Sequence, residues 1–134
     1  MPDAKSPRVL AIVPNGPDRT VIEELSGEAG WLLTVDDAPA FTNWWRDEAV
    51  PPVVLFDRSL AGSRWQKAIG SLAGSTCHPY VILLSPTSDS NLWEELQRLG
   101  GADVVRTPLN RQILLQAVNR GWQFWRSQQQ VRQC

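Results

Sequence analysis

The chain has 134 residues, a hydrophobic content of 43% and a net charge of −1, which fit one ordinary globular domain with a core of its own. No apolar run approaches the ~20 residues needed to span a bilayer, and the first residues lack the apolar core of a secretion signal. Two distant cysteines, Cys77 and Cys134, give neither metal-ligand spacing nor a disulfide framework. We therefore expect a reduced, cytoplasmic protein that does not associate with membranes.

The charge is unevenly distributed along the chain. No acidic residue follows Asp103, so the segment after it carries +5 and the first 103 residues carry −6. A basic segment can indicate nucleic-acid binding. Helical spacing separates Arg111, Arg120 and Arg126 around the predicted last helix, so they form no single basic stripe. We therefore expect no direct binding of nucleic acid.

Five apolar, strand-like runs alternate with helix-like segments. The first run, residues 9–13, ends in a proline-rich turn. A helix then begins at Asp18 or Thr20, where Thr20 and Glu23 have the spacing of a capping box, and Gly30 ends it. The second run covers residues 31–35. A short helix follows it, capped by Asp37 and carrying three aromatic side chains, Phe41, Trp44 and Trp45.

The third run, residues 53–56, is uninterrupted Val-Val-Leu-Phe and leads directly into Asp57. Such a run is typical of a strand that is buried on both faces of a parallel sheet. Asp57 then lies at the carboxyl end of the strand, where open α/β sheets bind their ligands. It is a candidate nucleophile or metal ligand, and the alternative is a turn or helix-capping aspartate.

The second half of the chain repeats this alternation. Ser63 caps a predicted helix whose apolar face consists of Trp65, Ala68, Ile69 and Leu72. The fourth run covers residues 80–84, and the next helix opens at Ser88 or Ser90. The apolar residues of that helix are Leu92, Trp93, Leu96 and Leu99. His78 precedes the fourth run at the edge opposite Asp57, so we interpret it as a loop histidine.

A short fifth run, residues 104–105, leads into the last helix, which Asn110 caps. The apolar face of this helix consists of Ile113, Leu114, Ala117, Val118, Gly121, Trp122 and Trp125. Because the apolar pattern stops near Trp125, we expect the helix to end there. We predict a disordered segment over residues 1–7, a domain over 8–126 and a tail or linker over 127–134.

Strands that alternate with helices at this spacing predict right-handed crossovers and a parallel sheet covered on both faces. The fold class is therefore α/β. Five strands and five helices predict the flavodoxin-like (βα)5 three-layer sandwich, with a five-stranded parallel sheet in the order 2-1-3-4-5.

Three segments, in this order, resemble the landmarks of the receiver domain of two-component response regulators. Residues 57–62, DRSLAG, resemble the phosphoacceptor motif D-x-x-L-P-G, with Ala61 in place of the proline. Residues 80–85 resemble the fourth strand with its terminal Ser or Thr. Residues 100–109, GGADVVRTPL, resemble the family's segment G-A-x-D-[YV]-L-x-K-P, which ends in lysine and proline. The resemblance covers roughly residues 8–125 and implies phosphoryl transfer from a kinase phosphohistidine to an aspartate.

The resemblance also implies roles for individual residues. Asp57 matches the phosphoacceptor, the Ser85 hydroxyl matches the group that contacts the phosphoryl oxygens, and the Ser59 carbonyl matches a backbone metal ligand. The acidic pair of the family, however, falls on Val13 and Pro14. The phosphoryl-contacting lysine falls on Thr107, and the aromatic switch residue falls on Val104.

These replacements weaken the expected chemistry. Mg²⁺ normally needs one or two carboxylates besides phosphate oxygens, so Asp57 alone holds it weakly, if at all. Without metal and lysine, an incoming phosphoryl group meets an uncompensated carboxylate. We therefore predict a degenerate, non-enzymatic receiver without a cofactor, in which Asp57 is phosphorylated weakly or not at all.

Two other functions remain open from the sequence. A working phosphoacceptor would receive its phosphoryl group on Asp57 from a histidine kinase, with Mg²⁺ and with Asp18 as a compensating ligand. A flavin-binding electron carrier of the same fold would need a hydroxyl-rich phosphate loop after the first strand. Residues 14–20, PNGPDRT, contain one threonine and two prolines, which argues against it.

The expected partner is a signalling protein, either a histidine kinase or an output domain, and a homodimer is the further possibility. Receivers commonly associate through the face formed by the fourth helix, fifth strand and fifth helix. The candidate residues on this face are Trp93, Arg106, Arg120, Trp125 and Arg126.

Overall fold

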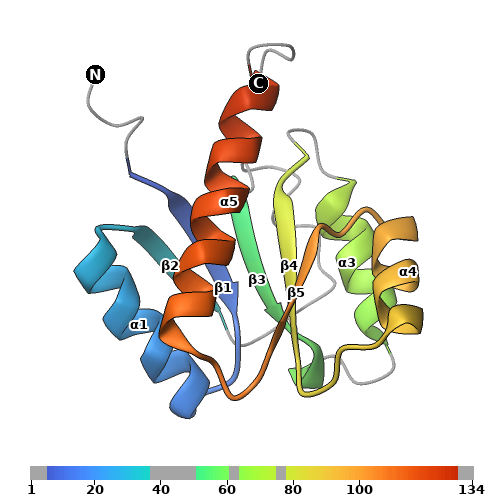
Figure 1. The fold of residues 1–134 in the computed structure, drawn as a ribbon, viewed down its shortest axis with the longest axis horizontal. Coiled ribbons are helices and arrows are strands. Elements are labelled where there is room, and N and C mark those ends of the chain that lie inside the picture. The colour runs from blue at the N-terminus through green and yellow to red at the C-terminus, as the bar shows by residue number, and fades with distance from the viewer. Residues whose placement is uncertain (1–5, 37–50, 61–63, 75–77, 130–134) are drawn as a thin grey trace.

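A computed structural model describes residues 6–36, 51–60, 64–74 and 78–129 of the chain. Within these ranges, strands and helices alternate, and the helices cover both faces of one sheet (Figure 1). The elements are β1 (Arg8–Ile12), α1 (Pro17–Ala29), β2 (Leu32–Asp36), β3 (Val53–Asp57), the 3-10 helix η2 (Arg58–Leu60), α3 (Trp65–Ala73), β4 (Tyr80–Ser85), α4 (Ser90–Arg98), β5 (Asp103–Arg106) and α5 (Arg111–Gln129).

All five strands are parallel and lie in the order β2-β1-β3-β4-β5, which confirms the predicted flavodoxin-like topology. Asp57 pairs in register with Leu84 of β4, so the ends of β3 and β4 lie side by side. The described residues form four α-helices, and the predicted helix with Phe41, Trp44 and Trp45 lies outside them, as does Ser63.

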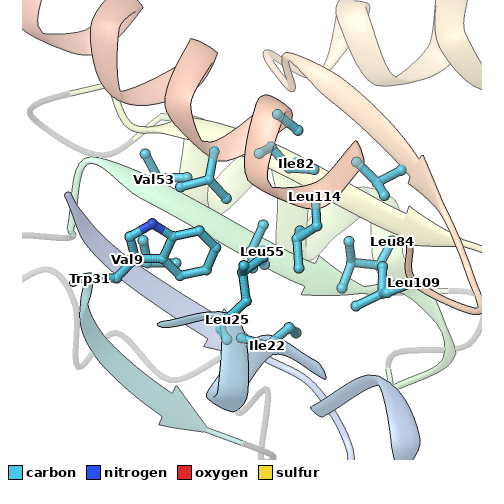
Figure 2. Close-up of a cluster of buried hydrophobic side chains, with 14 of the residues drawn as sticks. Val9, Ile22, Leu25, Trp31, Val53, Leu55, Ile82, Leu84, Leu109 and Leu114 are labelled. Atoms are coloured by element: carbon cyan, nitrogen blue, oxygen red, sulfur yellow. The ribbon is translucent and has the colours of Figure 1, made fainter. Parts of the chain in front are cut away.

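The sheet separates two hydrophobic cores, because successive side chains of a strand point to opposite faces. Val9 and Leu55 face α1 and α5, and Figure 2 shows them beside Leu25 of α1 and Leu114 of α5. The alternate residues of the same strands face α3 and α4. This second core consists of Leu10, Ile12, Val54, Phe56, Trp65, Ala68, Ile69, Leu72, Val81, Leu83, Leu92 and Leu96. The burial of β3 on both faces explains its uninterrupted apolar sequence.

One helix start differs from the prediction, and a second helix starts as predicted but with a cap that was not predicted. Helix α1 begins at Pro17 after Gly16, and no side chain caps it. Thr20 already lies inside the first turn, where its hydroxyl donates to the Gly16 carbonyl at 3.2 Å, so the predicted capping box was wrong. Helix α4 begins at Ser90, but its cap is Asp89, whose Oδ1 accepts from the Leu92 amide at 2.8 Å.

Helix α5 begins as predicted but is longer. The Asn110 side chain accepts from the Ile113 amide at 3.0 Å and caps it. The helix continues past the predicted end at Trp125 to Gln129, because glutamine is a good helix former even where the apolar pattern has stopped. The predicted core residue Ile113 is 54% exposed, since it lies at the edge of the apolar face in the first turn.

Candidate functional site

The carboxyl edge of the sheet brings together two residues that the resemblance singles out. Asp57 is the last residue of β3 and is buried, and Ser85 is the last residue of the neighbouring strand β4 and is 0% exposed. Thr107 lies beside them, because its backbone amide donates to the Ser85 carbonyl at 3.0 Å. The structure therefore gathers the candidate acceptor and both candidate phosphoryl-contacting positions at one edge.

Ser59 holds one oxygen of the Asp57 carboxylate. The Ser59 amide donates to Asp57 Oδ1 at 2.9 Å, and the Ser59 hydroxyl donates to the same oxygen at 2.7 Å. The resemblance pointed to the Ser59 carbonyl as a metal ligand, and it gave no role to this side chain. Two donors on Oδ1 orient the carboxylate and reduce the lone pairs that it offers to a metal ion or a phosphoryl group.

Arg58 brings a cation to the site. Its Nη1 lies 3.4 Å from the Ser85 hydroxyl and 3.5 Å from the Thr87 hydroxyl. Its guanidinium carbon lies 5.3 Å from the centre of the Trp65 ring, within cation–π distance. The signal in the sequence was the adjacency of Arg58 to Asp57, but its contacts come from two other segments, residues 85–87 and the start of α3, which only the fold brings next to it.

The end of β1 supplies no carboxylate to this edge. Val13 is 0% exposed, its side chain lies in the core beneath α1 and α5, and its amide donates to the Asp36 carbonyl at 3.0 Å. Pro14, the second position of the family's acidic pair, is half-buried.

Two other carboxylates lie near the edge but have different surroundings. Asp18 Oδ1 accepts from the Leu109 amide at 2.9 Å and so connects the first turn of α1 to the loop before α5. Asp36 ends β2, which is separated from β3 by β1, so the backbones at Asp36 and Asp57 are about 10 Å apart. Within the described ranges, no group of three or more His, Cys, Asp or Glu residues is arranged to hold a metal ion.

The residues of the predicted interaction face do not gather at one place; they lie near both ends of β5. Arg106 ends β5 and is exposed, whereas Arg120 lies 3.8 Å from Asp103 at the start of that strand. Helix α5 runs opposite to the strands, so its last turns lie at the edge where the strands begin (Figure 1). There the Trp125 ring stacks on Trp122, with 5.8 Å between centroids.

The other two members of this face also have intramolecular contacts. The Arg126 guanidinium lies 5.7 Å from the centre of the Trp122 ring. Trp93 is half-buried on α4, and its indole nitrogen donates to the Ser88 hydroxyl at 3.2 Å. His78, at the edge opposite Asp57, is exposed.

Comparisons with known proteins identify the fold. No family model matches the chain, and no curated protein matches it. Among solved structures, it resembles the signal receiver domain of a modulated diguanylate cyclase from Desulfovibrio desulfuricans, with a TM-score of 0.76 and 15% identity over 92% of this chain and 99% of that one. A response regulator from Thermotoga maritima matches with a TM-score of 0.76 and 15% identity, over 88% of this chain and 98% of that one.

A further match is the signal receiver domain of an HD domain-containing protein from Pseudomonas fluorescens. Its TM-score is 0.80 and its identity 14%, over 94% of this chain and 93% of that one. The three matches extend over nearly the whole length of those structures. The chain therefore has the fold of a response-regulator receiver domain, and its sequence is far from those of the matched structures. None of the helices in the described part of the chain is long and apolar enough to cross a membrane.

Proposed function

We propose that the chain is a degenerate receiver domain of two-component signalling that acts in the cytoplasm as a protein-interaction module, with weak or no phosphorylation of Asp57. The observation that carries the proposal is the end of β1, where buried Val13 and half-buried Pro14 stand in place of two carboxylates. Phosphoryl transfer depends on positioning and on neutralising charge, largely by a metal ion. Without these two carboxylates, the site attracts Mg²⁺ poorly.

The surroundings of Asp57 support the same proposal. Its Oδ1 already accepts two hydrogen bonds from Ser59, and Thr107 replaces the lysine that would meet the phosphoryl oxygens. The partner we propose is a histidine kinase or an output domain. Two of the structures that the chain resembles are receiver domains of a diguanylate cyclase and of an HD domain-containing protein, which favours an output domain.

A phosphodonor assay tests the proposal. The full chain is incubated with a small-molecule phosphodonor and Mg²⁺, and its intact mass is measured, with a known active response regulator as the positive control. We expect the mass of the chain to remain unchanged. A gain of one phosphoryl mass that is lost in Asp57→Asn would overturn the proposal.

That outcome would favour the second candidate function, a working phosphoacceptor. One observation supports this alternative: the structure gathers a buried carboxylate, a serine hydroxyl and the Arg58 cation at one edge. The flavin-binding alternative has less support. It needs free hydroxyl groups for the flavin phosphate after β1, whereas the hydroxyl of Thr20, in the first turn of α1, donates to the Gly16 carbonyl. A visible absorption spectrum of the purified chain tests it.

A further inference from the structure

The hydroxyl of Ser85 is covered by the chain itself. Ser85 is 0% exposed although it ends a strand at the edge where the site lies, and Arg58 Nη1 lies 3.4 Å from its Oγ. An arginine cannot be deprotonated in proteins, so this group carries its charge at any ordinary pH. The Ser85 hydroxyl, which the resemblance assigns to phosphoryl contact, therefore already has a cation of the same chain as its partner.

Arg58 is held in this position from a second side. Its guanidinium lies over the ring of Trp65, which is buried at the start of α3. Planar guanidinium groups stack well on aromatic faces, and stacking reduces the rotamers open to a long side chain. The ion pairs between described residues do not include Arg58. The described contacts of Arg58 are thus with two hydroxyl groups and an aromatic ring.

The contacts of Arg58 extend into the loop between β4 and α4. The Thr87 amide donates to Ser85 Oγ at 3.2 Å, and the Thr87 hydroxyl lies 3.5 Å from both Ser85 Oγ and Arg58 Nη1. The amide contact lies at the upper end of the normal range for a hydrogen bond, and the two hydroxyl contacts are longer than that range. Together they connect η2, α3 and the β4–α4 loop through one side chain.

We propose that Arg58 is a positioning residue that fixes the β4–α4 loop by binding the Ser85 and Thr87 hydroxyls, so that the loop conformation is set by Arg58 and not by chemistry at Asp57. This inference rests on the proposed function, because it explains how a receiver that is not phosphorylated keeps one conformation at this edge. A partner that binds beside the loop would then meet the same surface at all times.

Backbone relaxation of the 15N-labelled full chain tests the inference. In the wild type we expect a rigid order parameter of about 0.85 at Thr87, and a value below about 0.6 in Arg58→Gln. Asp57→Asn should leave the Thr87 value unchanged. Arg98→Gln is the matched control, because it removes an exposed arginine from the last turn of α4.

Two more measurements separate positioning from general stability. Arg58→Lys keeps the charge and an N–H donor group but loses the planar stacking group, so it should preserve the order of Thr87 only in part. In the wild type, the Arg58 Nε–H heteronuclear NOE should be close to backbone values, and that of Arg98 should be that of a mobile side chain. The second measurement needs no variant, so it holds even if Arg58→Gln does not fold.

Two results would overturn the inference: an Arg58 side chain as mobile as Arg98, or a folded Arg58→Gln variant in which Thr87 keeps its wild-type order parameter. The phosphodonor assay reports on the proposed function separately. If the wild type gains a phosphoryl group while Arg58→Gln still disorders Thr87, the proposed function fails and the positioning role stands. If Arg58→Gln abolishes such a gain without changing Thr87, Arg58 contacts the phosphoryl group and the positioning role fails.

Discussion

Asp18 shows how a single carboxylate can acquire a structural task that its sequence position does not reveal. It lies in the first turn of α1, where a negative charge interacts favourably with the helix dipole. Its Oδ1 also accepts from the Leu109 amide, in the loop that leads into α5. The sequence offered it as a compensating metal ligand, whereas in the structure it connects two elements that are distant in the chain.

Removing this carboxylate should therefore cost stability. We expect Asp18→Ala to lower the free energy of unfolding by about 2 kcal/mol, because a hydrogen bond to a charged group is lost and the Leu109 amide is left without its acceptor. Asp18→Asn keeps an acceptor oxygen for the Leu109 amide, so it should lose no more than half as much stability as Asp18→Ala. Urea unfolding of the three proteins measures this. Equal losses in Asn and Ala would show that the charge, not the hydrogen bond, stabilises this contact.

At the scale of elements, the approach of α5 to the sheet depends on a missing side chain. A Cβ added at Gly121 would lie 2.9 Å from Cγ of the Tyr80 ring on β4, closer than real Cβ atoms approach other atoms. Gly27 of α1 offers a matched contrast, because a Cβ there would meet nothing within 4 Å. Both glycines lie inside helices, so the intrinsic preference for alanine is the same at the two positions.

The two alanine substitutions should thus have opposite effects. Gly121→Ala should destabilise the fold by about 1–3 kcal/mol, the usual cost of overpacking. Gly27→Ala should stabilise it by about 0.5–1 kcal/mol, because alanine restricts the unfolded chain and favours the helix. Thermal unfolding followed by circular dichroism would reveal the difference. A stabilising Gly121→Ala would mean that Tyr80 moves aside without cost.

For the whole molecule, the first prediction is that Asp57 is silent because groups are missing at the site, while the scaffold that holds it is complete. Site residues of α/β folds lie on loops at the strand ends, and the core is built from the strands. The position of Val13 limits how the site can be rebuilt. Val13→Asp would bury an unpaired charge in the core beneath α1 and α5, at a cost of several kcal/mol. Half-buried Pro14 and Thr107 are the better positions.

We therefore expect the double variant Pro14→Asp, Thr107→Lys to remain folded and to gain one phosphoryl mass from a small phosphodonor with Mg²⁺. Each preorganised charge-stabilising group is typically worth roughly 3 kcal/mol of barrier. Intact mass measures the gain, and adding Asp57→Asn should abolish it. If the folded double variant stays unmodified, Arg58 is the next group to change, since it covers the Ser85 hydroxyl.

The second prediction for the whole molecule concerns pH. Burial raises the pKa of the Asp103 carboxyl above its usual 3.8, while its hydrogen bond to the Val104 amide and the nearby Arg120 oppose this. The folded state then binds the proton more tightly than the unfolded state. The contribution of Asp103 to stability is greatest at low pH and falls as the pH rises from 3.8 through the folded-state pKa.

Asp103→Asn keeps the acceptor for Val104 and removes this titration. The free energy of unfolding of the variant relative to the wild type should accordingly be higher at pH 7 than at pH 3. Urea unfolding at both pH values tests the sign. If the free energy of unfolding of the variant relative to the wild type were the same at the two pH values, or higher at pH 3, the raised pKa of Asp103 would be contradicted.

The sequence by itself determined the topology and the position of the candidate acceptor, Asp57. The uninterrupted run of residues 53–56 predicted a strand buried on both faces, and the residue that follows this run was expected at the ligand-binding edge, so Asp57 was placed correctly. The apolar faces of α3 and α4 also followed from helical spacing, because that pattern is local. Helix ends were less well predicted, since the cap at Asp89 and the glutamines of α5 carry no apolar signal.

Only the tertiary structure decided which side chains meet beside Asp57. Arg58, Trp65, Ser85 and Thr87 come from three segments of the chain, and nothing in their spacing shows that the guanidinium lies over the ring and against both hydroxyls. The same is true of Asp18 and Leu109. Periodicity reports which face of an element is buried, but a contact between polar side chains depends on strand register and rotamers, which are fixed only when the elements pack together.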